Sequence, residues 1–347
     1  AILLSGLVIP VRSQPDGSSP TAAAAANLTT ADRALIDEAL PKQAVVPPRQ
    51  PRRLLIYDAN VGYPGHPSRF YANYAFQRMG ETTRAFTAVV SRDPKICAPL
   101  SLQQFDAVFL NNTVGNLFED PALRKSLADF VYRGGGLLGG HGTTVAFTRW
   151  EDAARDDWPE FGRMLGARGA AHRDSNEQVY ITLDSPDHPL NQPFSREGFF
   201  YRDEFFRVHD PYSRKRLRVL FRIDTQRTDL GQADGRPPER ADQDYALAWV
   251  RSYGRGRVCY CTIGHHPRVF QDPTMLQFYC GATQFVLGDL SAPTTPSQRL
   301  TPAVLRQEQL GWRLGITAYT FHKYTMFETI DKTAALGISY LGGLNFQ

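Results

Sequence analysis

Two histidines and a carboxylate follow strand-like runs at separate places in the chain. His141 comes after a glycine-rich run, His265 follows the apolar run 258–263, and Glu204 comes shortly after the aromatic run 199–201. An imidazole changes its charge near neutral pH, so it can take up or release a proton during a reaction, and a carboxylate can share that task. We therefore regard His141, Glu204 and His265 as candidate catalytic residues.

Glu204 has a second carboxylate beside it, Asp203. Side chains of adjacent residues in a strand point to opposite faces. We expect Glu204 to point into the site. Asp203 is expected to lie beside it, where it either contacts the substrate or makes a structural salt bridge.

The same residue types are ligands of divalent metals. His172, Glu204 and His265 offer two imidazoles and a carboxylate, a set that suits a catalytic zinc ion with one open position. No local zinc motif accompanies them, so the cofactor stays unknown beyond a divalent metal such as zinc. Alternatively, these side chains bind sugar hydroxyls, and the aromatic ring of Trp158 or Tyr63 stacks on the sugar. The candidate substrate-binding residues are His66, Asn112, Trp158, His172 and Asp203.

Apolar runs alternate with helical patterns in the first part of the chain. Strands are expected at 53–58, 86–90, 105–112 and 137–140, and helices at about 69–79 and 121–132. This alternation is typical of a parallel sheet with helices on both faces, in which ligands bind at the carboxyl ends of the strands. His66, Asn112 and His141 follow such ends, so we expect them at one edge of the sheet.

The next part of the chain is richer in strand patterns. Strands are expected at 177–183, 216–224, 245–250 and 257–262, and a closing helix at 275–287. The last two strands are expected to form a hairpin around residues 254–256. Arginines alternate along 216–224, and we interpret them as a solvated sheet face rather than as an anion-binding strip.

Several short motifs occur in a fixed order between residues 52 and 290. They are Leu110-Asn111-Asn112-Thr113, Gly134-Gly135-Gly136-Leu137, Gly140-His141, Trp158-Pro159-Glu160-Phe161, Asp187-His188-Pro189-Leu190, Asp203-Glu204, Ala248-Trp249-Val250 and Gly264-His265. In order and spacing this set resembles the trehalose-utilisation (ThuA-like) family. The resemblance implies an α/β fold: a parallel-sheet, flavodoxin- or glutamine-amidotransferase-like three-layer domain with added β-rich insertions.

Two positions depart from what the resemblance implies. The family commonly has an acidic residue where this chain has Val145, and class I amidotransferases carry a nucleophilic cysteine at the turn that Gly140 and His141 occupy here. The four cysteines lie elsewhere, so cysteine-dependent glutamine hydrolysis lacks its nucleophile. The resemblance implies a protein that binds or transforms a sugar, perhaps an oxidised disaccharide, by His/Glu acid–base or metal-assisted chemistry. Val145 favours the alternative, a non-catalytic carbohydrate-binding module.

Residues 311–347 form a separate patterned segment. The runs 318–321 and 331–337 resemble the opening of a xylose-isomerase-like sugar isomerase/epimerase barrel, so we expect a truncated (β/α) barrel start there. In the alternative reading above, the carbohydrate-binding module serves this attached barrel. Residues 291–310 are expected to be a linker.

The chain begins at Ala1 with a short apolar run. Residues 1–12 have the length of a signal-peptide core and are expected to be its remnant, followed by a disordered or partly helical tether at 13–51. We therefore expect a periplasmic or secreted protein, and a cytoplasmic one if that interpretation fails. No run approaches the roughly 20 residues that span a bilayer, so no integral membrane segment is expected in the mature chain.

Composition excludes several classes of protein. Of 347 residues, 42% are hydrophobic and 21% charged, which is ordinary for a globular protein. The 39 Lys and Arg against 35 Asp and Glu give a net charge of +4, too small to indicate a nucleic-acid partner. The resemblance described above implies a small-molecule carbohydrate as the partner.

Overall fold

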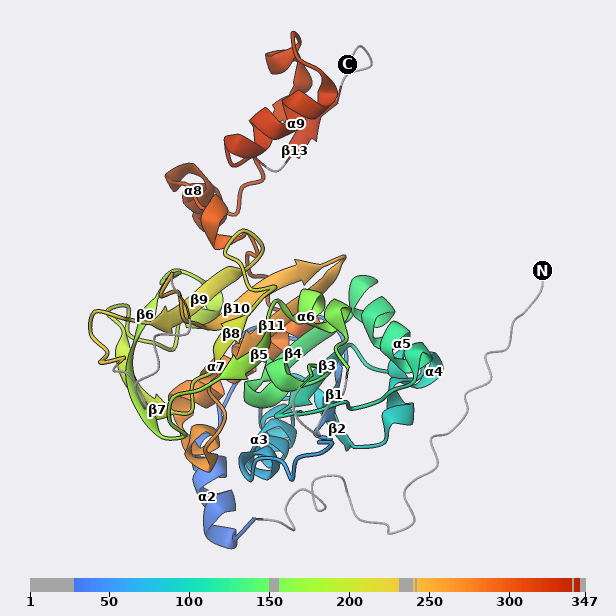
Figure 1. Ribbon diagram of the computed structural model, residues 1–347, viewed down its shortest axis with the longest axis vertical. Helices are drawn as coiled ribbons and strands as arrows, with labels where there is room; N and C mark the ends of the chain where they lie inside the picture. Colours follow the sequence, from blue (N-terminus) through green and yellow to red (C-terminus); the bar gives the residue numbers. More distant parts are fainter. Residues whose placement is uncertain (1–27, 150–155, 231–239, 241, 339, 344–347) are drawn as a thin grey trace, which may run out of the picture.

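A nine-stranded mixed sheet forms the centre of the molecule (Figure 1). The computed structural model describes residues 28–149, 156–230, 240, 242–338 and 340–343. Five neighbouring strands are parallel: β2 (Thr87–Ser91), β1 (Arg53–Tyr57), β3 (Ala107–Asn111), β4 (Gly136–Gly140) and β11 (Gly256–Cys261). The sheet continues with antiparallel strands: β10 (Ala246–Tyr253), β9 (Arg218–Ile223), β6 (Glu177–Leu183) and β7 (Phe199–Asp203). The predicted α/β fold with a parallel core and a β-rich extension is confirmed.

Helices cover both faces of this sheet. The face that carries Leu54 and Ile56 packs against α2 (Thr30–Ala39), α3 (Ser68–Thr83) and α7 (Pro273–Leu287). The opposite face carries Leu55 and Tyr57 and packs against α4 (Pro99–Leu102), α5 (Pro121–Tyr132) and α6 (Pro159–Leu165). Side chains of β1 alternate between the two cores because successive strand residues point to opposite faces. Two short strands, β5 (Arg168–Ala171) and β8 (Arg207–His209), pair outside the main sheet.

Residues 28–51 pack on the domain, which differs from the tether expected there. Ile36 and Leu40 are buried. Ile36 lies within α2 and Leu40 is the C-cap residue that follows it, and their spacing of four residues places both on one side of the helix. The Gln284 side chain accepts the Val45 N–H at 2.7 Å and donates to the Val46 carbonyl at 2.6 Å. This segment is therefore part of the domain. Residues 1–27, which include the expected signal-peptide remnant, lie outside the described residues.

A small βαβ unit follows the domain at its C-terminal side (Figure 1). It consists of β12 (Gly315–Thr317), α9 (Met326–Ala335) and β13 (Tyr340–Gly342), and the two strands are parallel. The described residues contain this single unit and no further strand of a barrel. None of the helices described is both long enough and apolar enough to cross a membrane.

One arginine of strand β9 connects this C-terminal region to the domain. The Arg218 side chain is 3% exposed, and its two terminal nitrogens lie 3.1 and 3.0 Å from the Glu308 carboxylate on α8 (Pro302–Leu310). The interpretation of the arginines of β9 as a solvated face is wrong at this position, because α8 and the preceding segment cover it. The expected linker 291–310 is thus partly helical and fixed by a buried ion pair.

His188 closes a turn before the short helix Pro189–Asn191 and is 2% exposed. The Leu190 N–H donates to its Nδ1 at 3.2 Å, so its Nε2 carries the hydrogen that the Pro293 carbonyl accepts at 3.1 Å. Burial lowers the pKa of His188 to about 3. The ring is therefore neutral in the folded protein at all but acidic pH.

We expect His188 to make the protein less stable in acid. Below pH 6.5, the ordinary histidine pKa, the unfolded chain binds one more proton at this position than the folded chain, so stability falls as the pH drops towards 3. Between pH 7.5 and pH 5 the loss from this residue is about 2 kcal/mol. Urea unfolding of the wild type and His188→Asn at both pH values measures it. His66 and His265 titrate alike in both proteins, so an equal loss in the variant would contradict the assignment.

Candidate functional site

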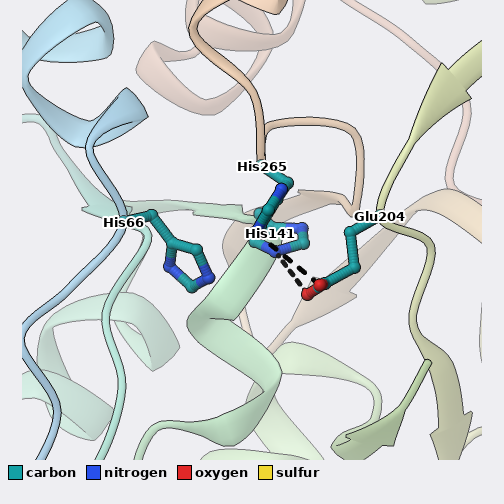
Figure 2. Close-up of side chains that lie close together, drawn as sticks. All are labelled: His66, His141, Glu204 and His265. Carbon is teal, nitrogen blue, oxygen red and sulfur yellow. Dashed lines mark ion pairs between the residues drawn. The ribbon is translucent and has the colours of Figure 1, made fainter. Parts of the chain in front are cut away.

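Side chains from four separate segments converge at the carboxyl edge of the parallel strands (Figure 2). His141 follows β4, His265 lies beyond the end of β11, His66 lies in the loop after β1, and Glu204 follows β7. One nitrogen or oxygen from each lies within 4.8 Å of the others. We call these four residues the histidine cluster.

The Glu204 carboxylate is the common neighbour of three histidines. Its oxygens lie 3.3 Å from His141 Nε2, 3.6 Å from His265 Nε2 and 3.5 Å from His172 Nδ1. These distances are longer than ordinary hydrogen bonds. Two ligands bound to one tetrahedral zinc ion at 2.0–2.1 Å lie about 3.3 Å apart, so the spacing suits atoms that share an ion.

The ring of His141 is held in one orientation. Its Nδ1 lies 2.7 Å from the Thr262 carbonyl, and because a carbonyl only accepts, Nδ1 carries the hydrogen. The Nε2 lone pair then faces Glu204, and this buried nitrogen has no hydrogen bond to any described residue. His141 also has φ of +40°, a left-handed conformation, and its ring stacks on Phe206 at 4.4 Å. A backbone carbonyl that fixes the tautomer is what metal-binding histidines usually have behind them.

The electrostatics favour neutral rings at His66 and His265 and an ionised carboxylate at Glu204. Burial, with help from the charge of neighbouring histidines, lowers the pKa of His66 to about 2 and that of His265 to about 4. Burial by itself raises the pKa of Glu204, but its interactions with His141, His265 and His172 outweigh it, so the pKa lies below its ordinary value. These are the protonation states in which both groups bind metals.

Asp203 supports the histidine cluster through the loop that carries His265. Its carboxylate is buried and accepts the backbone N–H groups of Gly264 at 2.8 Å, His265 at 3.1 Å and His266 at 3.0 Å. Asp203 was expected to contact substrate, but its oxygens are occupied by this loop. The two adjacent carboxylates thus have different partners: Glu204 lies beside the histidines, and Asp203 accepts the backbone N–H groups of the loop. Asp203, His265 and His266 also lie close enough to share an ion, although the backbone already uses Asp203.

Asn112 is likewise buried behind the cluster. Its side-chain nitrogen donates to the Gly264 carbonyl at 3.1 Å and to Ser68 Oγ at 3.2 Å, and its oxygen accepts the Gly142 N–H at 3.3 Å. It therefore connects the loops that carry His66, His141 and His265. Its expected contact with substrate is replaced by these internal contacts.

The remaining predicted residues lie at the rim or elsewhere. The His172 side chain is 46% exposed and lies at the rim, where it reaches Glu204. Trp158 packs against Phe147 and Phe161 with ring centroids 5.0 and 5.7 Å away, in the core of the opposite sheet face. The structure therefore brings His66, His141, His172, Glu204 and His265 together and gives Trp158 other partners.

One contributor to the site was missed in the sequence, the Thr262 carbonyl, which orients His141. Tyr63 was expected as an aromatic ring that stacks on a sugar, and the structure places its hydroxyl 3.3 Å from His66 Nε2. A backbone carbonyl carries no signal of residue type, so only the folded chain reveals Thr262.

Comparisons with known proteins agree with this fold. A ThuA-like protein from Bacteroides uniformis is 21% identical with a TM-score of 0.55, over 69% of this chain and 92% of that one. A ThuA-like protein from Parabacteroides merdae is 13% identical with a TM-score of 0.46, over 72% and 99%. A β-galactosidase from Rahnella is 14% identical with a TM-score of 0.41, over 68% and 31%. A search of curated proteins gives no match to this chain.

The family described as "Trehalose utilisation" (ThuA) matches residues 53–286. The match covers the nine-stranded sheet, the flanking helices other than α2, and all four residues of the histidine cluster. Because it extends over more than half of the sequence, this chain belongs to the trehalose utilisation (ThuA) family.

Proposed function

We propose that the histidine cluster holds a divalent metal ion, such as zinc, and that the protein uses it to bind and transform a sugar. The observation that carries the proposal is the spacing around Glu204, where His141 and His265 approach the carboxylate at 3.3 and 3.6 Å. The family description, trehalose utilisation, supports a sugar as the ligand.

The donor set fits an ion. The cluster supplies neutral imidazole nitrogens and one carboxylate, the ligands that zinc takes in catalytic sites. His141 Nε2 is buried with no hydrogen bond to a described residue, so an ion would satisfy an otherwise unpaired atom. The sequence suggested His172, Glu204 and His265 as ligands. We now propose His66 and His141 in place of His172, because His172 is half exposed at the rim.

Each residue has a task in this proposal. A bound ion polarises a sugar oxygen or lowers the pKa of water. The Glu204 carboxylate would balance the charge of the ion, and the fixed ring of His141 would orient it. Asp203 and Asn112 hold the loops that carry the histidines. His172 lies at the rim beside Glu204, where it is placed to exchange a proton between the bound sugar and solvent.

One observation favours a binding module without catalysis. Val145, where the resemblance implies an acidic residue, is partly buried against the core and offers no proton. In that case the cluster binds the sugar, and turnover is absent.

Metal analysis of the purified full chain, followed by a sugar assay, tests the proposal. We expect about one zinc-type ion per chain. Binding of trehalose and of its oxidised derivatives should be lost after chelation and restored by zinc. Turnover in the same assay separates the enzyme from the binding module. Full sugar binding by the metal-free protein would contradict the proposal.

Two expectations about the ends of the chain remain proposals. The parallel pairing of β12 and β13 supports the opening of a xylose-isomerase-like barrel, since parallel strands are usually covered on both faces and these strands are largely exposed. The apolar character of residues 1–12 supports export.

A further inference from the structure

Arg69 lies against the loop that carries His66. The loop turns at Gly65, which has φ of +85°, and the Arg69 guanidinium fills the space that a side chain at Gly65 would need. Arg69 Nη1 donates to the Pro64 carbonyl at 2.6 Å, and the Asn60 amide lies on the same side of Gly65. The guanidinium therefore lies against Pro64 and Gly65, the two residues that directly precede His66.

Arg69 forms no ion pair with any described residue. Asp58, whose charge raises the pKa of Arg69, pairs instead with Arg92 at 2.8 and 2.9 Å. Both guanidiniums lie over the Phe70 ring, at 4.5 Å for Arg69 and 5.6 Å for Arg92, so the two like charges are close. Burial, and then the charge of Arg92, lower the pKa of Arg69. A partly buried cation without a partner is costly, and an anion beside it would stabilise it.

Other polar atoms around this loop also lack hydrogen-bond partners. Arg69 Nε and Asn60 Oδ1 are buried without a hydrogen bond to any described residue. Asn60 Nδ2 donates only weakly, at 3.3 Å, to the Asp58 carbonyl. A guanidinium presents several donors in a fixed plane, which matches the oxygens of a carboxylate or phosphate.

We propose that Arg69 forms an anion subsite beside the histidine cluster, so that the preferred ligand is a sugar that carries a carboxylate or a phosphate. The inference rests on the proposed function, because it places the sugar between the cluster and Arg69. It narrows the substrate class from sugars in general to acidic sugars.

Three probes with the same six-carbon skeleton test this inference: glucitol, gluconate and glucitol 6-phosphate. Calorimetric titration of the full chain, with zinc and after chelation, measures their dissociation constants. We expect gluconate or glucitol 6-phosphate to bind about tenfold or more tightly than glucitol, which is the order expected of one charge-assisted contact. The tighter of the two anions identifies the charged group.

Variants show whether Arg69 causes the preference. Arg69→Gln removes the charge, and Asn60→Asp supplies an internal carboxylate while keeping Arg69 and the size of the side chain. Both should reduce the preference to about twofold or less. Arg255→Gln is the control, since it removes an exposed arginine from the β10–β11 turn at the opposite end of β11 and should leave the preference unchanged.

The outcomes separate this inference from the proposed function. Equal binding of glucitol and the anions, no binding of any probe, or a preference that survives both Arg69→Gln and Asn60→Asp would overturn the anion subsite. A protein that binds no zinc but keeps the Arg69-dependent preference would overturn the metal site alone. If Arg69→Gln fails to fold, Asn60→Asp gives the decision.

Discussion

Replacing His141 by alanine is expected to lower the affinity for zinc by more than about 100-fold. Loss of an outer-sphere partner typically costs roughly 10–100-fold, and His141 is proposed as a direct ligand, so its removal should cost more. In the wild type, His141 Nε2 makes no hydrogen bond to a described residue, so it is available to bind the ion. Competition with a chromogenic zinc chelator measures the affinity.

Two further variants sharpen this test. His141→Asn keeps a side chain that tolerates the left-handed backbone at φ +40°, so it separates loss of the ligand from backbone strain. His172→Ala is the matched control, because His172 touches the same carboxylate but is 46% exposed, and we expect less than about a tenfold change. Wild-type affinity in both His141 variants would remove His141 from the metal site.

Replacing Asp203 by alanine is expected to lower the free energy of unfolding by roughly 3–5 kcal/mol. The change leaves the N–H groups of Gly264, His265 and His266 without their acceptor inside the protein, and each unsatisfied buried group costs about 1–3 kcal/mol. The loop also loses the contact that positions the His265 ring, so zinc affinity should fall as well. Urea unfolding and chelator competition measure the two effects.

A second buried carboxylate provides the control for Asp203. Asp289 accepts the Arg49 N–H at 3.0 Å and pairs with Arg52, next to the amino end of β1 and far from the histidine cluster along the strand. Asp289→Ala should also destabilise the protein but leave zinc affinity unchanged. Asp203→Asn keeps one acceptor oxygen and should have about half the effect on stability. If Asp203→Ala left zinc affinity intact, Asp203 would be a residue of stability only.

Parallel strands explain why part of the site was predictable. The runs that became β1, β3 and β4 are continuous and apolar because both faces of the sheet are covered. The carboxyl ends of such strands share one edge, so a histidine after β1 and one after β4 are expected at the same edge of the sheet. The rings of His66 and His141 indeed lie 4.9 Å apart.

Other features depended on partners that are distant in sequence. The sequence pattern predicts Arg218 as an exposed strand residue. In the structure α8 covers it and Glu308 pairs with it. Residues 28–51 read as a tether because the groups that hold them, such as Gln284, lie more than 200 residues away. Trp158 was expected to stack on a sugar, but its partly buried ring packs against Phe147 and Phe161.

The sequence by itself determined the α/β fold, the sheet edge at which the site lies, and the residue types gathered there, because hydrophobic periodicity and strand direction are local properties. Only the tertiary structure decided which atoms face inward. The Thr262 carbonyl sets the His141 tautomer, the 264–266 loop occupies the Asp203 carboxylate, and Asp58 forms its ion pair with Arg92 and not with Arg69. These outcomes depend on hydrogen bonds and ion pairs between distant segments, which form only when the chain has packed.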